Sequence, residues 1–322
     1  MLKIIRGINN IPSKWAGCVV TIGNFDGVHC GHQQLIANLA QQAALHQLPA
    51  VVITFEPQPN EFFAAADAIP ARLMRWREKY AVFSALPVDY MLCLSFDRSL
   101  ALLSAEEFIE KIVVKQLKAA HVVVGDDFHF GYRRSGDIYL LQQQGAHWGF
   151  SVSCAPSYYL GQTRVSSSQV RQALQQGDLN LAQQYLGRPY GMFGRVVHGH
   201  KRGRTIGFPT ANLLLHRRTV PLSGVYVVTA RLLRHTEEDL LLQGVANVGT
   251  RPTVGGTRSL LEVHLFDFNQ DIYGCTLYVT FIQKLRDEER YDSFELLQKQ
   301  IQKDAQNARD YFAEIKQIDA SA

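Results

Sequence analysis

The chain contains few cysteines and arranges none of them in a metal or redox motif. The five cysteines, Cys18, Cys30, Cys93, Cys154 and Cys275, are scattered over 322 residues, and none is part of a C-x-x-C pair. An odd and scattered set argues against a disulfide framework or a structural zinc site. It favours a reducing compartment, so we expect a cytoplasmic protein.

Long hydrophobic runs are also missing. No apolar run approaches the ~20 residues that a membrane-spanning helix needs, and residues 1–6 are too short and too interrupted for a signal peptide. The net charge is only +4, which suits anionic small molecules such as nucleotides but gives no reason to expect a nucleic-acid surface. We expect small-molecule substrates, no membrane or nucleic-acid partner, and a monomer or weak homo-oligomer.

The common glycine-rich phosphate-binding motifs are absent as well. No glycine is followed by another glycine two positions later, and the pattern G-x-x-x-x-G-K-[ST] does not occur. These absences exclude the dinucleotide-binding fingerprint, the protein-kinase glycine loop and the P-loop. Any nucleotide site must therefore be built from other motifs.

Up to about residue 186, short apolar runs alternate with helical patterns. The runs are rich in Val and Ile and cover residues 18–22, 51–55, 90–94, 122–124 and 151–155. Between them, Leu35, Ile36 and Leu39 have helical spacing, and Ser104 with Glu107 forms a capping box. This alternation predicts a doubly wound parallel α/β sheet, with ligands at the carboxyl ends of its strands.

After about residue 187 the glycines become denser and the pattern changes to β-strands. Runs at 224–228, 240–244 and 277–281 predict antiparallel strands of a small β barrel, and residues 293–315 predict a closing helix. We therefore expect two domains, residues 1–186 and 187–322.

The most informative segment follows the first apolar run. Residues 18–32 read C-V-V-T-I-G-N-F-D-G-V-H-C-G-H, which is typical of a strand, a tight turn and a helix start. A helix N-terminus offers free N–H groups to phosphate, and glycines let the backbone approach a ligand. His29 and His32 could donate hydrogen bonds to a phosphate that gains charge during reaction. Alone, such a histidine pair is more often a surface pair or weak metal site than a catalytic one.

Three more polar segments follow strands of the same predicted sheet. They are F-E-P-Q-P at 55–59, G-D-D-F-H-F-G at 125–131 and V-S-S-S-Q-V-R at 165–171. Singly, the aspartates could be turn residues and the serines a helix cap. Together with the histidines they predict nucleotidyl transfer, in which a phosphate attacks the α-phosphorus of ATP and pyrophosphate leaves.

A second constellation lies at residues 194–212, where cationic side chains alternate with glycines before the turn P-T-A-N. Lys and Arg beside exposed N–H groups suit a triphosphate, and the neutral oxygens of Thr210 and Asn212 suit Mg²⁺. The alternative is a solvated basic hairpin. Glu262, inside an apolar β run, is a candidate general base, although it could also lie on the exposed face of an edge strand.

These motifs, in this order, resemble those of the bifunctional bacterial riboflavin kinase/FMN adenylyltransferases, also called FAD synthetases. The first half carries G-N-F-D-G-V-H-x-G-H, F-E-P-x-P, G-D-D-F-x-F-G and S-S-S-x-V-R. The second half carries the highly specific G-F-P-T-A-N, then G-V-A-N-V-G-x-R-P-T-V-G-G and L-E-V-H-L-x-D-F. The resemblance implies phosphorylation of riboflavin to FMN by residues 187–322 and adenylyl transfer from ATP to FMN, giving FAD, by residues 1–186.

The resemblance also implies roles for individual residues. In the first domain, His29, His32 and Arg171 would be catalytic, and the ligand contacts would be Gly23, Asn24, Phe25, Asp26, Gly27, Asp127, Phe128, Ser167 and Ser168. In the second, Glu262 would take the proton of the ribityl 5′-hydroxyl, and Thr210 and Asn212 would hold Mg²⁺ with ATP. Further contacts there would be Gly199, Lys201, Gly203, Arg204, Gly207, Pro209, Asn247 and Arg251.

Two other functions compete with this interpretation. One is an adenylyltransferase for a different phosphate ester, and the flavin-type segment 126–131 argues against it. The other is a flavin-binding regulator without turnover, which would have no need of Glu262 or of the histidine pair.

Overall fold

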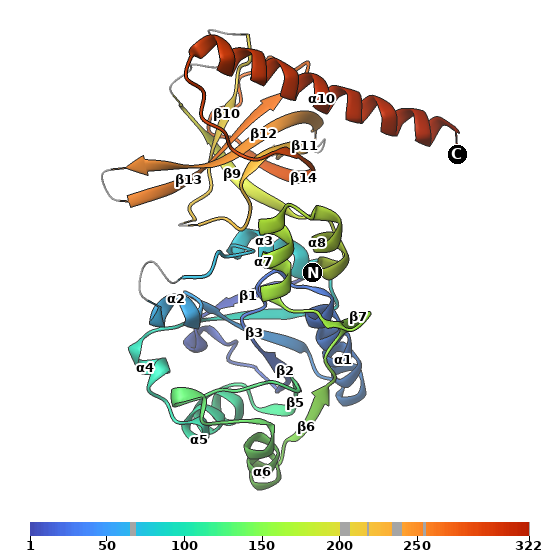
Figure 1. Cartoon of the computed structure of the whole chain (residues 1–322). Helices are drawn as coiled ribbons and strands as arrows, with labels where there is room; N and C mark the ends of the chain where they lie inside the picture. Colours follow the sequence, from blue (N-terminus) through green and yellow to red (C-terminus); the bar gives the residue numbers. More distant parts are fainter. Residues whose placement is uncertain (65–68, 200–206, 218, 234–239, 254–255, 322) are drawn as a thin grey trace. The chain divides into compact units, whose positions relative to one another are not determined.

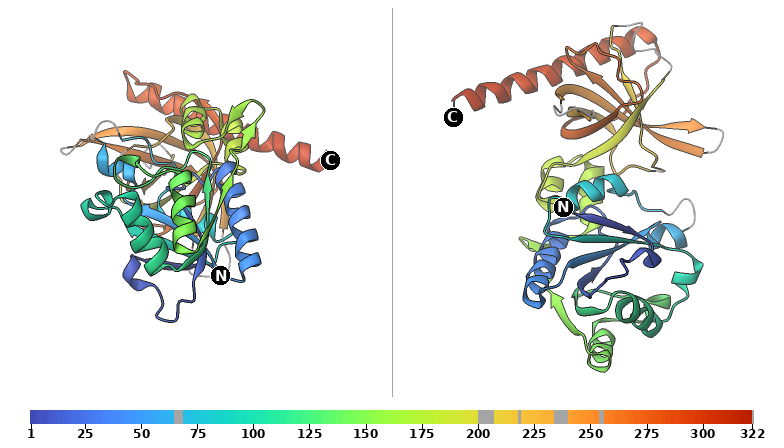
Figure 2. Two further views of the ribbon diagram at one scale, coloured as in Figure 1. Left: turned by 90° about the horizontal axis from the view of Figure 1, so that it is seen from below. Right: turned by 180° about the vertical axis from the view of Figure 1, so that it is seen from behind.

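In the computed structural model the chain forms two compact units (Figures 1 and 2). The structure describes residues 1–64, 69–199, 207–217, 219–233, 240–253 and 256–321. The first unit comprises Met1–Pro70 and Lys79–Ser167, and the second comprises Ala71–Glu78 and Ser168–Ala322. The domain boundary expected at residue 187 stays a prediction.

The first unit is built on a parallel sheet of six strands in the order β1-β4-β3-β2-β5-β6. The strands are β1 (Lys3–Arg6), β2 (Cys18–Ile22), β3 (Ala50–Glu56), β4 (Tyr90–Ser95), β5 (Ala119–Gly125) and β6 (Ser151–Ala155). All five predicted apolar runs are strands, and β2 is buried along its whole length. The predicted parallel α/β sheet is therefore confirmed, with β1 as an additional edge strand.

Helices lie on both faces of this sheet (Figures 1 and 2). The helices of this part of the chain are η1 (Ile8–Asn10), α1 (Cys30–His46), α2 (Pro59–Phe63), α3 (Trp76–Phe83), α4 (Arg98–Ala101), α5 (Ala105–Phe108), η3 (Ile109–Gln116), η4 (Tyr132–Arg134) and α6 (Ile138–Trp148), of which α3 begins in the second unit. The predicted capping box opens α5. Ser104 Oγ accepts a hydrogen bond from the N–H of Glu107 at 3.1 Å, and the Glu107 carboxylate accepts one from the N–H of Ser104 at 3.0 Å. Two donors at the helix start are thereby satisfied.

The second unit is a closed antiparallel barrel with the strand order β10-β13-β12-β11-β14-β9. Its strands are β9 (Gly191–Val197), β10 (Ala211–Leu214), β11 (Gly224–Leu233), β12 (Leu240–Thr253), β13 (Gly256–Leu265) and β14 (Thr276–Arg286). Helices α7 (Ser167–Gln176) and α8 (Leu179–Leu186) precede the barrel, and α10 (Phe294–Ser321) ends it. The predicted barrel with a terminal helix is confirmed.

Helix α10 covers part of the outside of the barrel. Val227 of β11 and Val245 of β12 are register partners, and both belong to a buried cluster with Ala305, Ala308 and Phe312 of α10. Burial of this apolar stripe on both partners holds the helix to the barrel. Polar residues on the outer face of β11 and β12 therefore lie next to the apolar surface that α10 covers.

Candidate active sites

The turn after β2 reverses the chain through left-handed backbone. Phe25, Gly27 and Val28 have φ angles of 47°, 84° and 41°. Positive φ at two non-glycine residues is costly and persists only where the surrounding structure imposes it, which is typical of functional sites. The reversal places His29 at the N-cap of α1, where its Nδ1 accepts a hydrogen bond from the N–H of His32 at 3.4 Å.

The two predicted histidines lie against each other at this helix start. Their rings stack with centroids 3.7 Å apart, and the ring of Phe25 meets His32 edge-on at 5.1 Å. A Cβ at Gly31 would lie 3.2 Å from the ring of His29, so glycine at this position relieves a tight contact with that ring. The pair is thus held rigidly next to the helix N-terminus, where phosphate binds favourably.

A cavity of about 750 Å³ opens at this carboxyl edge of the sheet. The predicted residues that line it are Gly23, Asn24, Phe25, Asp26, His29, His32, Asp127, Phe128 and Ser167. Ser167 ties its segment to the turn, since its Oγ donates a hydrogen bond to the carbonyl of Asp26 at 2.8 Å. Gly27 lies in the same turn. Ser168 and Arg171 belong to the second unit, where Arg171 Nε donates to the carbonyl of Ala71 at 2.6 Å.

One wall of this cavity is aromatic. Phe96 meets Phe55 at 5.8 Å and Phe63 at 5.7 Å between ring centroids, and Phe128 stacks on Phe130 at 5.3 Å. Edge-to-face and stacked rings of this kind form an apolar surface. Of these phenylalanines, the sequence analysis predicted only Phe128 as a ligand contact. The double phenylalanine of α2 was the signal that could have indicated Phe63.

Two cationic side chains of the first unit were also missed. Lys79 is only 2% exposed, and its ammonium donates to the carbonyl of Asn24 at 2.7 Å and to Thr54 Oγ1 at 2.9 Å. Arg164 pairs with Asp127 at 2.6 Å. No sequence signal marks Lys79, because a lysine in an amphipathic helix is expected to point into water.

Asp126 beside this pair is held in its charged form. Desolvation opposes ionisation, but hydrogen bonds from Ser157 and the charge of Arg164 outweigh it and lower the pKa of Asp126. The Ser157 N–H donates at 3.1 Å and its hydroxyl at 2.8 Å. The edge of the cavity therefore carries fixed charges of both signs.

In the second unit, three predicted residues form a row across adjacent strands. Asn212 of β10 is the register partner of Glu262 of β13, and Glu262 is in turn the partner of Asn247 of β12. Directly paired residues point to the same face of a sheet. All three are partly exposed, whereas their chain neighbours Leu213 and Val263 are buried inside the barrel. The amide, carboxylate and amide thus share the outer face, with the carboxylate in the middle.

The ends of the neighbouring segments are fitted closely to this row. A Cβ at Gly199 would lie 2.2 Å from Nδ2 of Asn212, so only glycine leaves room for that amide. Thr210 immediately precedes β10 and is exposed. The preceding carbonyl, of Pro209, accepts a hydrogen bond from Nδ1 of His264 at 2.9 Å, which fixes the turn to β13.

The second unit also has a cavity of about 880 Å³, and the residues that line it do not include Asn212, Glu262 or Asn247. It is lined by Gly207, Phe208 and Pro209, by His264 and Asp267, and by Arg309 of α10 together with neighbouring residues. Burial lowers the pKa of His264, so its imidazole tends to be neutral. Arg309 holds both oxygens of Asp267 at 2.9 Å. Predicted residues Lys201, Gly203 and Arg204 lie outside the described residues, as does the side chain of Arg251.

Both halves match known protein families. The family described as FAD synthetase matches residues 11–169, and the family described as riboflavin kinase matches residues 186–312. The bifunctional riboflavin kinase/FMN adenylyltransferase of Escherichia coli (strain K12) is 47% identical over 98% of this chain and 99% of its own length. The chain belongs to the bifunctional riboflavin kinase/FMN adenylyltransferase family. The predicted pair of activities is thereby confirmed.

Other comparisons agree with this family. The bifunctional riboflavin kinase/FMN adenylyltransferase of Haemophilus influenzae is 46% identical over 97% of this chain and 99% of its own. A solved structure described as a macrolide-efflux protein from Streptococcus pneumoniae is 32% identical, has a TM-score of 0.80, and covers 96% of this chain and 98% of its own. Among the helices of the described residues, none has the length and hydropathy needed to cross a membrane.

The row on the barrel of the second unit offers oxygen ligands of the kind that suit Mg²⁺. Thr210 and Asn212 supply neutral hard oxygens, and the carboxylate of Glu262 lies opposite Asn212. The Asn212 amide fills the space that a side chain at residue 199 would occupy, so Gly199 lets this ligand group lie against the backbone. The oxygen donors of these residues are of the type that Mg²⁺ prefers.

Proposed function

We propose that the row Asn212–Glu262–Asn247 is the riboflavin kinase centre and that the cavity beside His29 and His32 is the adenylyl-transfer centre. The observation that carries the first assignment is the direct pairing of Glu262 with an amide on each side. Two amides can orient a carboxylate and a neighbouring substrate without neutralising the charge of the carboxylate.

In the kinase step, Glu262 accepts the proton of the riboflavin 5′-hydroxyl. The hydroxyl oxygen then bonds to the γ-phosphorus of ATP, the bond to the bridging oxygen breaks, and ADP leaves. Asn212 and Thr210 would hold Mg²⁺, which supplies charge neutralisation at the phosphates when bound. Glycines such as Gly207 leave space for the backbone to approach the triphosphate.

In the adenylyl-transfer step, a phosphate oxygen of FMN bonds to the α-phosphorus of ATP, and pyrophosphate leaves as the old bond breaks. His29 and His32 donate hydrogen bonds to the phosphate that gains charge, supported by the N-terminus of α1. The aromatic wall that includes Phe128 supports binding of the isoalloxazine ring by stacking. Ser168 and Arg171 are assigned to the pyrophosphate end on their motif alone.

We also propose that the protein acts in the cytoplasm, as a monomer or weak homo-oligomer, with Mg²⁺ in both steps and without a nucleic-acid partner. The scattered cysteines and the small net charge of +4 support this. Gel filtration with light scattering tests the oligomeric state.

The decisive experiment follows products by chromatography from riboflavin, ATP and Mg²⁺. FMN followed by FAD is the expected result, and FMN supplied directly must give FAD and pyrophosphate. Binding of flavin without either product would instead support a regulator without turnover. Omission of Mg²⁺ in a parallel reaction tests the metal requirement, because both products must then be lost.

A further inference from the structure

Eight residues from the middle of the first half of the sequence pack with the second unit. Residues Ala71–Glu78 group with Ser168–Ala322, whereas the residues on either side group with the parallel sheet. The segment is followed directly by Lys79, whose contacts with Asn24 and Thr54 lie in the first unit. The second unit, which contains the proposed kinase centre, is therefore made of two separate stretches of the sequence.

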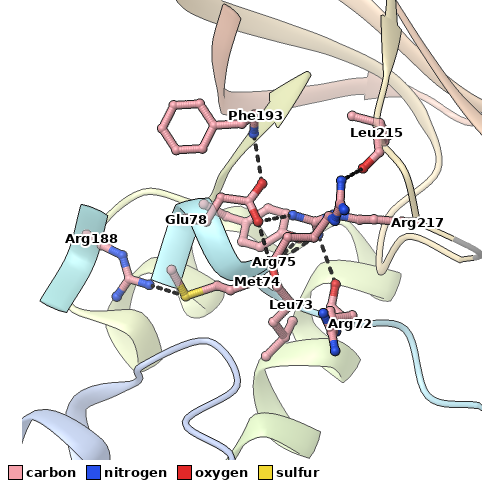
Figure 3. Close-up of polar contacts among 10 residues, drawn as sticks. Arg72, Leu73, Met74, Arg75, Glu78, Arg188, Phe193, Leu215 and Arg217 are labelled. Carbon is pink, nitrogen blue, oxygen red and sulfur yellow. Dashed lines mark hydrogen bonds and ion pairs between the residues drawn. The ribbon is translucent and has the colours of Figure 1, made fainter. Parts of the chain in front are cut away.

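A buried ion pair fixes this segment (Figure 3). The Nη2 atom of Arg217 lies 2.6 Å from Oε2 of Glu78, and the two side chains are only 1% and 2% exposed. A buried charge is costly unless it is paired and hydrogen-bonded, and removal of one partner leaves the other uncompensated. The ion pair therefore fixes the distance between the backbone at residue 78 and the backbone at residue 217.

Each member of the pair also binds backbone. The other Glu78 oxygen, Oε1, accepts from the N–H of Phe193 in β9 at 2.8 Å, while Oε2 also accepts from the N–H of Arg75. Arg217 Nη1 donates to the carbonyls of Arg72 at 2.9 Å and Leu73 at 3.1 Å. The ion pair thus joins strand β9, the residues after β10 and the 71–78 segment.

The segment makes a second contact just past the end of β10. Arg75 Nη1 donates to the carbonyl of Leu215 at 3.0 Å (Figure 3). Leu215 directly follows β10, which has only four residues, Ala211–Leu214. Arg75 and Arg217 therefore anchor the chain immediately after the strand.

Strand β10 carries Asn212, three residues before this anchor, and pairs with β9 along Val197, Val196 and Arg195. The start of β9 is anchored by Glu78 through Phe193, and Gly199 just past its end lies against the Asn212 amide. Strand β10, which carries Asn212, and its neighbour β9 are thus both held by the same buried carboxylate and its partner. A small shift of β10 would move Asn212 relative to Glu262.

We propose that the Glu78–Arg217 ion pair positions β10, and with it Asn212, for phosphoryl transfer. Glu78 and Arg217 are positioning residues of the kinase although Glu78 lies within the first half of the sequence. This inference rests on the proposed role of Asn212 in holding Mg²⁺. Residues that orient a metal ligand change metal affinity or activity by about 10–100-fold when they are replaced.

The test is a Mg²⁺ titration of riboflavin phosphorylation by the full chain with Arg217→Met. We expect the Mg²⁺ concentration at half-maximal rate to rise and kcat to fall, each about tenfold or more. KM for riboflavin stays within about twofold, because the change does not touch the flavin. Arg217→Lys, which keeps the charge but loses the planar fork, should lie between the parent and Arg217→Met. Unchanged Mg²⁺ dependence in a folded variant overturns the proposal.

A matched control separates positioning from loss of stability. Arg286 forms a comparable ion pair with Asp304 in the same unit, at 2.7 Å with 19% and 6% of the side chains exposed. Arg286→Met should lower the melting temperature but leave the Mg²⁺ dependence within about twofold of the parent. An equal change in Mg²⁺ dependence for Arg286→Met would overturn the proposal.

The double variant Glu78→Met with Arg217→Met removes both charges, so it should regain the stability that either single variant loses. The Mg²⁺ dependence should stay impaired because the anchors to Phe193 and Arg72 are gone. Full recovery of kinase activity would overturn the proposal. Should Arg217→Met not fold, Arg217→Lys is measured in its place, with the same expected direction and the same overturning result.

One further variant distinguishes failure of this inference from failure of the proposed function. If Asn212→Ala leaves the Mg²⁺ dependence unchanged, the proposed metal role of Asn212 is wrong. If Asn212→Ala raises the Mg²⁺ requirement and Arg217→Met does not, only the positioning role is wrong.

Discussion

Asn212 and Glu262 are direct partners across β10 and β13, fifty residues apart in the sequence and side by side on the barrel surface. The pairing puts the amide of Asn212, the proposed Mg²⁺ ligand, next to the carboxylate of Glu262, the proposed proton acceptor. It requires the register of β10 to be held, because a slip of one residue would turn Asn212 to the opposite face. The register of one short strand is thus central to the proposed kinase chemistry.

Glu262→Gln should abolish most riboflavin phosphorylation while FMN adenylylation continues. Gln keeps the size of the side chain but cannot accept the hydroxyl proton, so we expect a fall of about 10²–10⁴-fold in kcat. Chromatographic rates with riboflavin and with FMN as separate substrates measure the two activities. The exposed Glu314 of α10 provides the control, since Glu314→Gln should leave both rates unchanged. Equal loss of both activities in a folded Glu262→Gln protein would contradict the assignment of two separate centres.

His32→Ala should have the reverse effect. It removes one of two stacked imidazoles next to the N-terminus of α1, so FMN adenylylation should fall by about 10²-fold or more. Riboflavin phosphorylation should be retained, and FMN should accumulate without FAD. Pyrophosphate release from FMN and ATP measures the loss directly. Normal FAD formation by the variant would exclude His32 from catalysis.

Gly199→Ala should impair the kinase through Asn212. The added Cβ would lie 2.2 Å from Nδ2 and 2.5 Å from Cγ of Asn212, so the amide must move. We expect kcat for riboflavin phosphorylation to fall by about tenfold or more, by analogy with other changes next to metal ligands. The effect should vanish in an Asn212→Ala background, where there is no amide to displace. Additive losses in the double variant would show that Gly199 acts by another route.

The stability of the first unit should depend on pH through His121. The imidazole is 6% exposed and lies between the hydroxyls of Ser151, at 2.6 Å, and Ser153, at 2.8 Å. Burial, and then the nearby charge of His46, lower its pKa from the ordinary value of 6.5. The unfolded chain therefore takes up this proton first, and the free energy of unfolding decreases as the pH falls below 6.5.

Chemical denaturation between pH 8 and pH 5 measures this dependence. His121→Gln should flatten the pH profile, because the replacement does not titrate. The exposed His147 of α6 provides the control, and His147→Gln should keep the profile of the parent. A profile that is identical in the parent and in His121→Gln would contradict the prediction.

The architecture was largely predictable because its signals are local. Apolar runs such as 18–22 become buried strands of the parallel sheet, and the pair Ser104 and Glu107 marks a helix start. The motif around His29 and His32 likewise lies within a few residues, so its turn and helix N-terminus could be predicted together. Edge strand β1 was missed because four residues carry too little pattern to separate a strand from an irregular end.

The two fold types, the family and the residue types of both centres could be predicted without coordinates, because each of these depends on short-range patterns and specific motifs. Which distant residues meet depends instead on how the chain packs. The row Asn212–Glu262–Asn247 depends on strand register, and the burial of Lys79 and the pairing of Glu78 with Arg217 depend on how separate segments pack. Local sequence does not indicate such pairings. A charged residue in a helix, such as Glu78 or Lys79, has the same sequence pattern whether its side chain contacts water or a buried polar partner.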